Sequence, residues 1–290
     1  MNLKKAYKDG ITILEEAGIP EAANDAKIFL TEALGVDYGY ILAHIDDELP
    51  EDEYKEKLAI YYADLDRRAE RIPLQHILGH TYFMGLKFKV NENALIPRPD
   101  TEILVEEVLK YIHDGMEVLD VCTGSGCILT SLLYYTNYVK GTGTDISEEA
   151  LALAKENSDM LLKDKEGTEY KYIKSDIYDS VEGMFDIIVS NPPYIKSSVI
   201  PGLEPEVKDH DPLNALDGGE DGLIFYRRLI AEAGKHLKMA GRIFLEIGYD
   251  QAKEVSELLK ENDFTDIEVI KDYQDNDRVV TAGRKICLTN

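Results

Sequence analysis

The sequence of 290 residues lacks long apolar runs and has few cysteines. No stretch approaches the roughly 18–20 apolar residues that cross a membrane, and the start, MNLKKAYKDG, has lysines but no apolar segment. We therefore expect neither a membrane span nor a secretory signal. The 3 cysteines are an odd number, which favours reduced thiols and a cytoplasmic protein.

Basic residues are also scarce: 32 Lys and Arg stand against 56 Asp and Glu, giving a net charge of −24. Affinity for nucleic acid rests mainly on cations that neutralise phosphates, so this balance disfavours a protein that binds DNA or RNA. A local basic patch would still permit such binding. The hydrophobic share, 44%, is that of a globular protein with a full core.

The first part of the chain is predicted to be helical. Apolar residues recur there at helical spacing, in three sets: Leu3, Tyr7 and Leu14; Ala22, Ala26, Phe29 and Ala33; and Leu58, Tyr61, Leu65, Ala69 and Ile72. Pro20 and Gly35 stand where a helix would start and end. We expect a helical domain over residues 1–75, followed by a β-hairpin linker over 76–94, because polar and apolar residues alternate after Gly85.

Residues 95–290 alternate between strand-like and helical segments, which predicts an α/β domain with a mostly parallel sheet. Strands are expected at 118–122, 138–145, 170–175, 185–190, 242–247, 267–270 and 278–282, and helices include 148–157 and 223–237. The last two strands are too close in sequence for a helical crossover, so the last strand should be antiparallel.

Ligands of such a sheet bind beyond the carboxyl ends of its strands. The first of these strands ends in a glycine-rich loop, Cys122 to Gly126, whose glycines let the backbone turn tightly and a ligand approach. A plain strand-to-helix turn would have the same composition. A dinucleotide fingerprint needs a third glycine three residues further on, where this chain has Leu129. An adenosine ligand without a pyrophosphate, such as S-adenosylmethionine, suits the loop better.

Acidic residues follow the next two strands. Asp145 suits the two hydroxyls of a ribose, although a helix cap is the alternative, with Ser147 close by. Asp176 suits the amino group of an adenine, with Ile177 packed on the ring, and it is equally compatible with an exposed turn.

The fourth strand ends in Asn191-Pro192-Pro193-Tyr194. Proline fixes the backbone and has no N–H, so the Asn191 side-chain oxygen and the Pro192 carbonyl remain as acceptors. Two acceptors suit an –NH₂ group, and Tyr194 offers a flat face to a planar amide or base. Holding both hydrogens helps a poorly nucleophilic nitrogen as charge develops on it. Outside this context the tetrapeptide would simply form a loop.

The order of these motifs resembles the release factor glutamine methyltransferases, the HemK/PrmC family of class I methyltransferases. The similarity covers nearly the whole chain and includes PLQHILG (73–79), FMG (83–85), LIPRPDTE (95–102), LDGGEDG (216–222), YR (226–227), EIG (246–248) and DRVV (277–280). It implies a Rossmann-like sheet of seven strands beside a small helical domain. It also implies methyl transfer from S-adenosylmethionine to the side-chain amide nitrogen N5 of the glutamine in the Gly-Gly-Gln loop of peptide chain release factors.

The resemblance carries site residues with it. Cofactor contacts fall on Cys122, Thr123, Gly124, Ser125, Gly126, Asp145, Asp176, Ile177 and Asn191, and substrate contacts on Asn191, Pro192, Pro193 and Tyr194, of which Asn191, Pro192 and Tyr194 are expected to be catalytic. The chain departs from the expected pattern at Asp100, where Glu is usual, and at His210-Asp211-Pro212, where a Glu-Pro pair is usual. Release factors are the expected partners, with no direct nucleic acid, no membrane and a monomeric enzyme.

Two other functions use some of the same features. An adenine-N6 methyltransferase of DNA or RNA would grip its base with the same tetrapeptide, but the net charge of −24 disfavours it. A nucleotide-binding regulator without catalysis would need the glycine loop but not the rigid Asn-Pro-Pro-Tyr edge. His76 and His80 suggest a metal, yet no acidic third ligand is evident, so none is expected. Arg98, between two prolines, would line the site or pair with Glu102.

Overall fold

The structure, a computed structural model, describes residues 2–48 and 50–285, and for residues 51–53 the backbone alone. The chain forms two compact units, one of Met1–Leu78 with Pro205–His210 and the other of Gly79–Glu204 with Asp211–Asn290. Within the described ranges, every helix is too short or too polar to span a bilayer. Cys122 and Cys127 are free thiols, and Cys287 lies outside the described residues.

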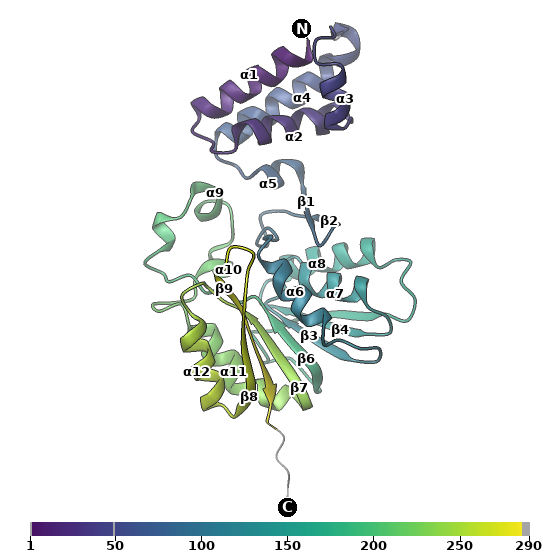
Figure 1. The fold of residues 1–290 in the computed structure, drawn as a ribbon. Helices are drawn as coiled ribbons and strands as arrows, with labels where there is room; N and C mark the ends of the chain where they lie inside the picture. Colours follow the sequence, from purple (N-terminus) through teal and green to yellow (C-terminus); the bar gives the residue numbers. More distant parts are fainter. Residues whose placement is uncertain (1, 49, 286–290) are drawn as a thin grey trace, which may run out of the picture. The chain divides into compact units, whose positions relative to one another are not determined.

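The first unit is helical, as its apolar spacing predicts. Its helices are α1 (Leu3–Glu16), α2 (Ala22–Leu34), α3 (Tyr38–Ala43), α4 (Glu51–Ala69), α5 (Leu74–Leu78) and α9 (Pro205–Lys208). Helices α1, α2 and α4 pack side by side (Figure 1) and bury Leu14, Phe29 and Leu65 completely. Gly35 ends α2 with φ 70°, as expected of a C-cap glycine. Helices α3 and α5 were not predicted, because they are too short to show a helical period.

A buried network of ion pairs ties α9 to the helical unit, although α9 comes much later in the sequence. Arg68 of α4 donates to Asp25 of α2 at 2.8 Å and to Glu206 of α9 at 2.8 Å, and Arg71 reaches the other oxygen of Glu206 at 2.6 Å. The Arg68 side chain is 8% exposed. Burial raises the pKa of Asp25, and the hydrogen bond from Arg68 partly offsets that rise. The carboxylates of Asp25 and Glu206 therefore depend on the guanidinium groups of Arg68 and Arg71 as their ion-pair partners.

We predict that Arg68→Ala lowers the free energy of unfolding of the helical unit by about 3–5 kcal/mol, because it leaves the Asp25 carboxylate buried without its cation. Arg67 is the matched control, since it lies one residue away with its side chain 49% exposed and only a 4.0 Å contact to Asp64. Urea denaturation followed by circular dichroism should show a change within about 0.5 kcal/mol for Arg67→Ala. Equal losses for the two variants would contradict the structural role of the network.

The second unit contains a seven-stranded sheet with the order β5-β4-β3-β6-β7-β9-β8 (Figure 1). Its strands are β3 (Glu117–Val121), β4 (Lys140–Asp145), β5 (Glu169–Lys174), β6 (Phe185–Ser190), β7 (Leu237–Glu246), β8 (Phe264–Lys271) and β9 (Asp277–Arg284). Strand β9 runs antiparallel to β7 and β8, which confirms the prediction for the last strand. A separate antiparallel hairpin, β1 (His80–Phe83) with β2 (Leu86–Lys89), confirms the hairpin around Gly85.

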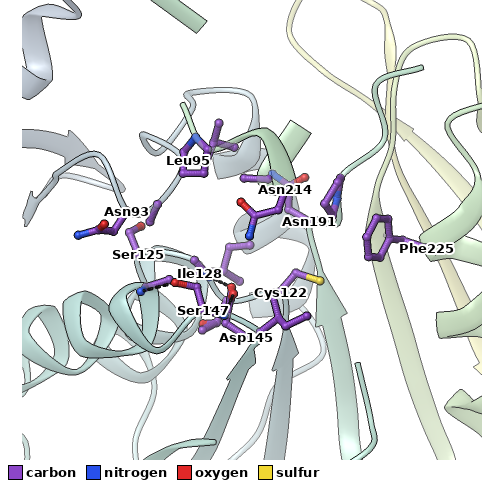
Figure 2. A pocket seen from close by; sticks show the side chains of 18 of the residues that line it. Asn93, Leu95, Cys122, Ser125, Ile128, Asp145, Ser147, Asn191, Asn214 and Phe225 are labelled. Carbon is purple, nitrogen blue, oxygen red and sulfur yellow. Dashed lines mark hydrogen bonds between the residues drawn. The ribbon is translucent and has the colours of Figure 1, made fainter. Parts of the chain in front are cut away.

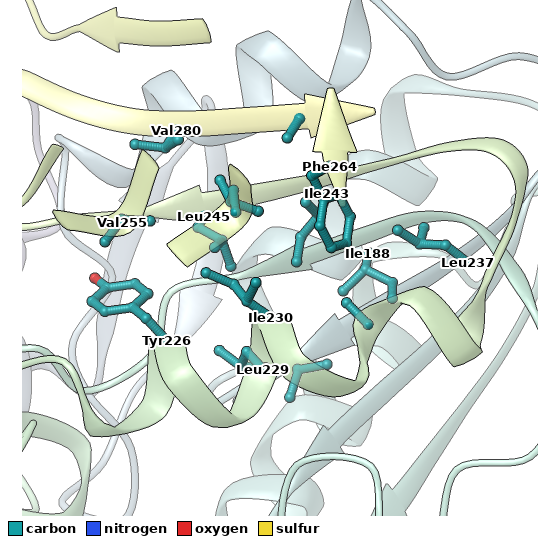
Figure 3. Packing of buried hydrophobic residues seen from close by; sticks show 14 of the residues in the cluster. Ile188, Tyr226, Leu229, Ile230, Leu237, Ile243, Leu245, Val255, Phe264 and Val280 are labelled. Carbon is teal, nitrogen blue, oxygen red and sulfur yellow. The ribbon is translucent and has the colours of Figure 1, made fainter. Parts of the chain in front are cut away.

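Helices cover both faces of the sheet. They are α6 (Thr101–Leu109), α7 (Cys127–Tyr135) and α8 (Glu148–Leu161) on one face and α11 (Ile224–His236) and α12 (Ala252–Glu261) on the other, with α10 (Leu213–Leu216) and a 3₁₀ turn (Ile200–Gly202) in the connection after β6. Side chains of the central strands alternate between two cores. Ile188 packs against α11 (Figure 3), while Ile187 and Val189 pack against α6 and α7. This burial on both faces is why the central strands are continuously apolar.

Candidate active site

A cavity of about 240 Å³ lies beyond the carboxyl ends of β3, β4 and β6 (Figure 2). Nine of the predicted site residues line it: Cys122, Thr123, Gly124, Ser125, Asp145, Asp176, Ile177, Asn191 and Pro193. Gly126, Pro192 and Tyr194 are not among the residues that line it. The parallel topology accounts for this gathering, because strands of one direction end at the same edge of the sheet.

The glycine-rich loop after β3 is held by a buried hydrogen bond on one side and borders the cavity on the other. Thr123 Oγ1 donates to the Asp120 carboxylate at 2.6 Å, and burial of that carboxyl raises its pKa to about 7. Gly124 has φ 53°, and a Cβ placed there would have no atom within 4 Å, so its Cα faces open cavity. Gly126 instead faces the protein, because a Cβ there would lie 2.8 Å from Cβ of Ala154. A glycine at position 126 is therefore required for the close approach of α7 and α8.

The Asp145 carboxylate is held at the cavity by backbone donors. Its Oδ2 accepts from Gly124 N at 2.9 Å and its Oδ1 from Ser147 N at 3.0 Å. Ser147, and not Asp145, is the N-cap of α8, because its hydroxyl accepts from Ala150 N at 3.0 Å. Each carboxylate oxygen keeps a further lone pair, so Asp145 is able to accept from two neighbouring hydroxyls of a ligand.

Helix α11 contributes two lining residues that the sequence did not reveal. Phe225 and Arg228 lie three positions apart, on one face of the helix, and both line the cavity. Arg228 forms an ion pair of 2.9 Å with Asp176, so the Asp176 carboxylate is already partly engaged. The sequence had drawn attention to Arg227, which pairs with Asp221 on the exposed surface. Spacing along the helix distinguishes the two arginines, because Arg228 lies three positions after Phe225 and on the same face, whereas Arg227 does not.

The Asn191 side chain at the end of β6 is oriented by Thr101, which the sequence analysis also passed over. Asn191 Nδ2 donates to Thr101 Oγ1 at 3.2 Å. This bond uses the amide nitrogen, so Oδ1 remains as the acceptor of that side chain. Thr101 begins α6 and belongs to the LIPRPDTE segment. Figure 2 shows Asn191 beside Asn214 of α10 and near Phe225.

Known proteins share this architecture and sequence. Residues 5–79 match the family profile described as the PrmC N-terminal domain, and residues 99–201 match that of the methyltransferase small domain. A release factor glutamine methyltransferase of Clostridium acetobutylicum is 40% identical over 287 residues, which cover 98% of this chain and 99% of the relative. Another, of Agrobacterium fabrum, is 36% identical over 277 residues, covering 93% of each.

The chain belongs to the family of release factor glutamine methyltransferases. It is an S-adenosylmethionine-dependent methyltransferase, which makes a regulator without catalysis the wrong alternative. A solved methyltransferase of Pyrococcus furiosus has the same fold, with a TM-score of 0.53 at 21% identity over 76% of this chain and 99% of that one. The predicted class I fold is thereby confirmed.

The residues of the cavity fit S-adenosylmethionine. The space over Gly124 admits a ligand against the backbone, and Asp145 presents acceptors for a ribose. Ile177 and Ile128 line the cavity with apolar surface of the kind that suits an adenine. The backbone of Ile177 has φ 55°, a conformation that non-glycine residues seldom adopt outside constrained sites.

Tyr194 has a different environment from the one predicted. Its ring packs against the sheet core, and its hydroxyl donates to Glu246 Oε1 at 3.4 Å. Phe225, and not Tyr194, is the aromatic residue that faces the cavity. The Tyr194 backbone is clamped as well. A Cβ on Gly218 would lie 2.7 Å from Cα of Tyr194, which explains one glycine of the LDGGEDG segment.

Arg98 and the two departures from the family pattern form ion pairs. Two roles were expected for Arg98: lining the site or pairing with Glu102. Arg98 pairs with the buried Asp211 instead of Glu102, and it is not among the residues that line the cavity. Asp100 pairs with Arg278 at 3.1 Å. At both departures from the family pattern, a carboxylate thus forms an ion pair with an arginine. Among the described residues, no three His, Cys, Asp or Glu side chains are arranged to hold a metal ion.

We predict that Asp145→Ala weakens S-adenosylmethionine binding by about 1.5–3 kcal/mol, the loss typical of hydrogen bonds to a charged acceptor. Isothermal titration calorimetry measures this directly. Asp164→Ala is the control, since Asp164 is exposed and lies outside the cavity. An unchanged Kd for Asp145→Ala would mean that the ribose is bound by other groups.

Proposed function

We propose that this enzyme transfers the methyl group of S-adenosylmethionine to the amide nitrogen N5 of the glutamine in the Gly-Gly-Gln loop of peptide chain release factors. The orientation of Asn191 carries the proposal. Its Nδ2 is bonded to Thr101, so Oδ1 is the acceptor left beside two prolines that have no N–H. A carboxamide –NH₂ is the group that such a pair of acceptors, Asn191 Oδ1 and the Pro192 carbonyl, would recognise.

The proposed cofactor contacts are those of the cavity: Cys122, Thr123, Gly124, Ser125, Asp145, Asp176, Ile177 and Asn191. Gly126 acts behind them by letting α8 approach. Substrate contacts fall on Asn191 to Tyr194, with Phe225 as the aromatic surface for the glutamine side chain. Tyr194 then acts mainly by holding the segment in place through its ring and its hydroxyl.

The chemical difficulty is the nucleophile, because the lone pair of an amide nitrogen is delocalised. When bound, S-adenosylmethionine supplies a methyl group activated by a positively charged sulfur. Methyl transfer from it would leave the sulfur as a neutral thioether and the nitrogen with one surplus proton, which would be released to solvent. Asn191 Oδ1 and the Pro192 carbonyl hold both hydrogens of the nitrogen and stabilise the positive charge that develops on it. The surrounding apolar groups keep water from competing for those hydrogens.

The helical unit contains none of these residues, and we propose that it docks the release factor. Contacts remote from the reaction would orient the glutamine. We also propose that the enzyme is a monomer. A cytoplasmic location is proposed as well, and the free thiols of Cys122 and Cys127 support it. Burial raises the pKa of Cys122 far above its ordinary value, so this thiol stays protonated at neutral pH.

We expect methyl label from S-adenosylmethionine to appear on an intact release factor, on the glutamine of its Gly-Gly-Gln loop, with tandem mass spectrometry locating the site. A peptide of that loop should show a lower kcat/KM by at least about tenfold, because it lacks the docking contacts. Label on the adenine amino group of DNA or RNA offered in parallel would overturn the substrate assignment. Equal kcat/KM for peptide and intact factor would remove only the docking role.

We predict that Asn191→Ala lowers kcat by roughly two to three decades, as loss of one preorganised polar group typically does. Cofactor affinity should stay nearly unchanged, because the seven other proposed cofactor contacts remain. Asn137→Ala, at an exposed position, serves as the control. Single-turnover methylation measures the effect on the chemical step. A kcat within threefold of the parent would exclude the assigned role of Asn191.

A further inference from the structure

Arg228 and Asp176 form an ion pair in the wall of the cavity, although their segments are far apart in the sequence. Arg228 Nη2 lies 2.9 Å from Asp176 Oδ2, and both residues line the cavity. Asp176 follows β5, whereas Arg228 lies on α11. The two side chains are 44% and 41% exposed, so the pair contributes little to the stability of the fold. Its place beside the proposed cofactor contacts indicates a role in binding instead.

The neighbouring Arg227 shows what is distinctive about Arg228. Arg227 also pairs with an aspartate, Asp221, and each of those side chains is 49% exposed. Neither of them is among the residues that line the cavity. The two ion pairs thus have similar exposure, start from adjacent residues of one helix and differ in whether they face the cavity. Arg227 is therefore a matched control for Arg228.

The backbone around Asp176 is held beside Asp145. Ser175 N donates to the Asp145 carbonyl at 2.9 Å, and the turn continues through Ile177 with φ 55°. Asp145 is the proposed ribose contact, and in a nucleoside the base is attached directly to the ribose. Asp176 is therefore placed to meet the adenine. These backbone contacts do not set the direction of the Asp176 carboxylate, which is held by its ion pair with Arg228.

The ion pair leaves one oxygen of the carboxylate for a ligand. An ionised carboxylate accepts hydrogen bonds on two oxygens, and Arg228 engages Oδ2, so Oδ1 is the oxygen left for an amino group. A guanidinium has donors only, so Arg228 cannot accept from that amino group itself. A bound cofactor would displace water from the pair, which strengthens the attraction between the two charges. The carboxylate would then be fixed more firmly in the complex than in the free enzyme.

We propose that Arg228 is a positioning residue that directs the Asp176 carboxylate toward the amino group of the adenine of S-adenosylmethionine. Arg228 acts through Asp176: it holds one carboxylate oxygen, and the other is presented to the amine. The pair makes the enzyme selective for a cofactor whose base carries an amino group. This inference rests on the proposed function, because it deepens the proposed cofactor contact of Asp176.

The test measures how well the enzyme distinguishes S-adenosylhomocysteine, the demethylated cofactor, from its analogue in which hydrogen replaces the adenine amino group. Isothermal titration calorimetry gives the Kd of each compound without release factor. We expect the parent to bind the amino compound about 10–100-fold more tightly, the range typical of a hydrogen bond to a charged acceptor. Arg228→Gln should lower this ratio at least about fivefold, because the acceptor is no longer oriented. Arg227→Gln should leave the ratio within about twofold of the parent value.

Further variants separate positioning from a structural role. Asp176→Ala removes the acceptor and should abolish the preference for the amino compound, and adding Arg228→Gln to it should not change the ratio again. Equal loss of affinity for both compounds in Arg228→Gln, with the ratio kept, would indicate a structural role and overturn the inference. If Arg228→Gln does not fold, Arg228→Met, which keeps the apolar part of the side chain, is measured in its place with the same expected fall.

The outcomes also distinguish this inference from the proposals on which it rests. A ratio that is lost in Asp176→Ala but kept in Arg228→Gln overturns the role of Arg228 and leaves the adenine contact of Asp176 intact. A ratio that is kept in Asp176→Ala overturns both. Because no release factor takes part in these titrations, a parent that methylates no release factor refutes the proposed substrate without changing either result.

Discussion

The hydrogen bond from Asn191 to Thr101 is the interaction on which the site depends. It joins the end of a central strand to the start of α6, two segments far apart in the sequence. A carboxamide is nearly symmetric in shape, so only its partners decide whether oxygen or nitrogen faces the cavity. Thr101 makes that decision by accepting from the amide nitrogen. The proposed recognition of an –NH₂ group thus depends on a residue that orients Asn191.

The rest of the unit keeps these few atoms in place. Asn191 follows a strand that is buried on both faces, and the backbone of Tyr194 is held against Gly218 without room for a Cβ. The carbonyl of Tyr194 accepts from Gln251 at 3.0 Å. The motif segment is fixed on several sides, and in the proposed mechanism its acceptors therefore need little reorganisation when charge develops, which is the usual source of electrostatic catalysis. This packing explains why position 218 of the LDGGEDG segment is a glycine.

The helical unit shows how far sequence order departs from spatial order. The segment 205–210 lies between β6 and β7 in the chain, yet Glu206 makes its ion pairs with Arg68 and Arg71 of the first unit. The connection after the Asn-Pro-Pro-Tyr motif therefore contributes residues 205–210 to the helical unit and then Pro212 to the cavity lining. No local sequence pattern predicts these ion pairs, because a single acidic residue in a loop has many possible partners.

The sequence by itself determined the fold class, the antiparallel last strand and nine of the residues that line the cavity. These follow from local rules: apolar periodicity, loop length and the convergence of parallel strand ends. Only the tertiary structure decided that Phe225 faces the cavity in place of Tyr194, that Arg98 pairs with Asp211, and that Thr101 orients Asn191. Such contacts join segments that no spacing relates, and their hydrogen-bond directions depend on burial, which exists only once the chain has folded.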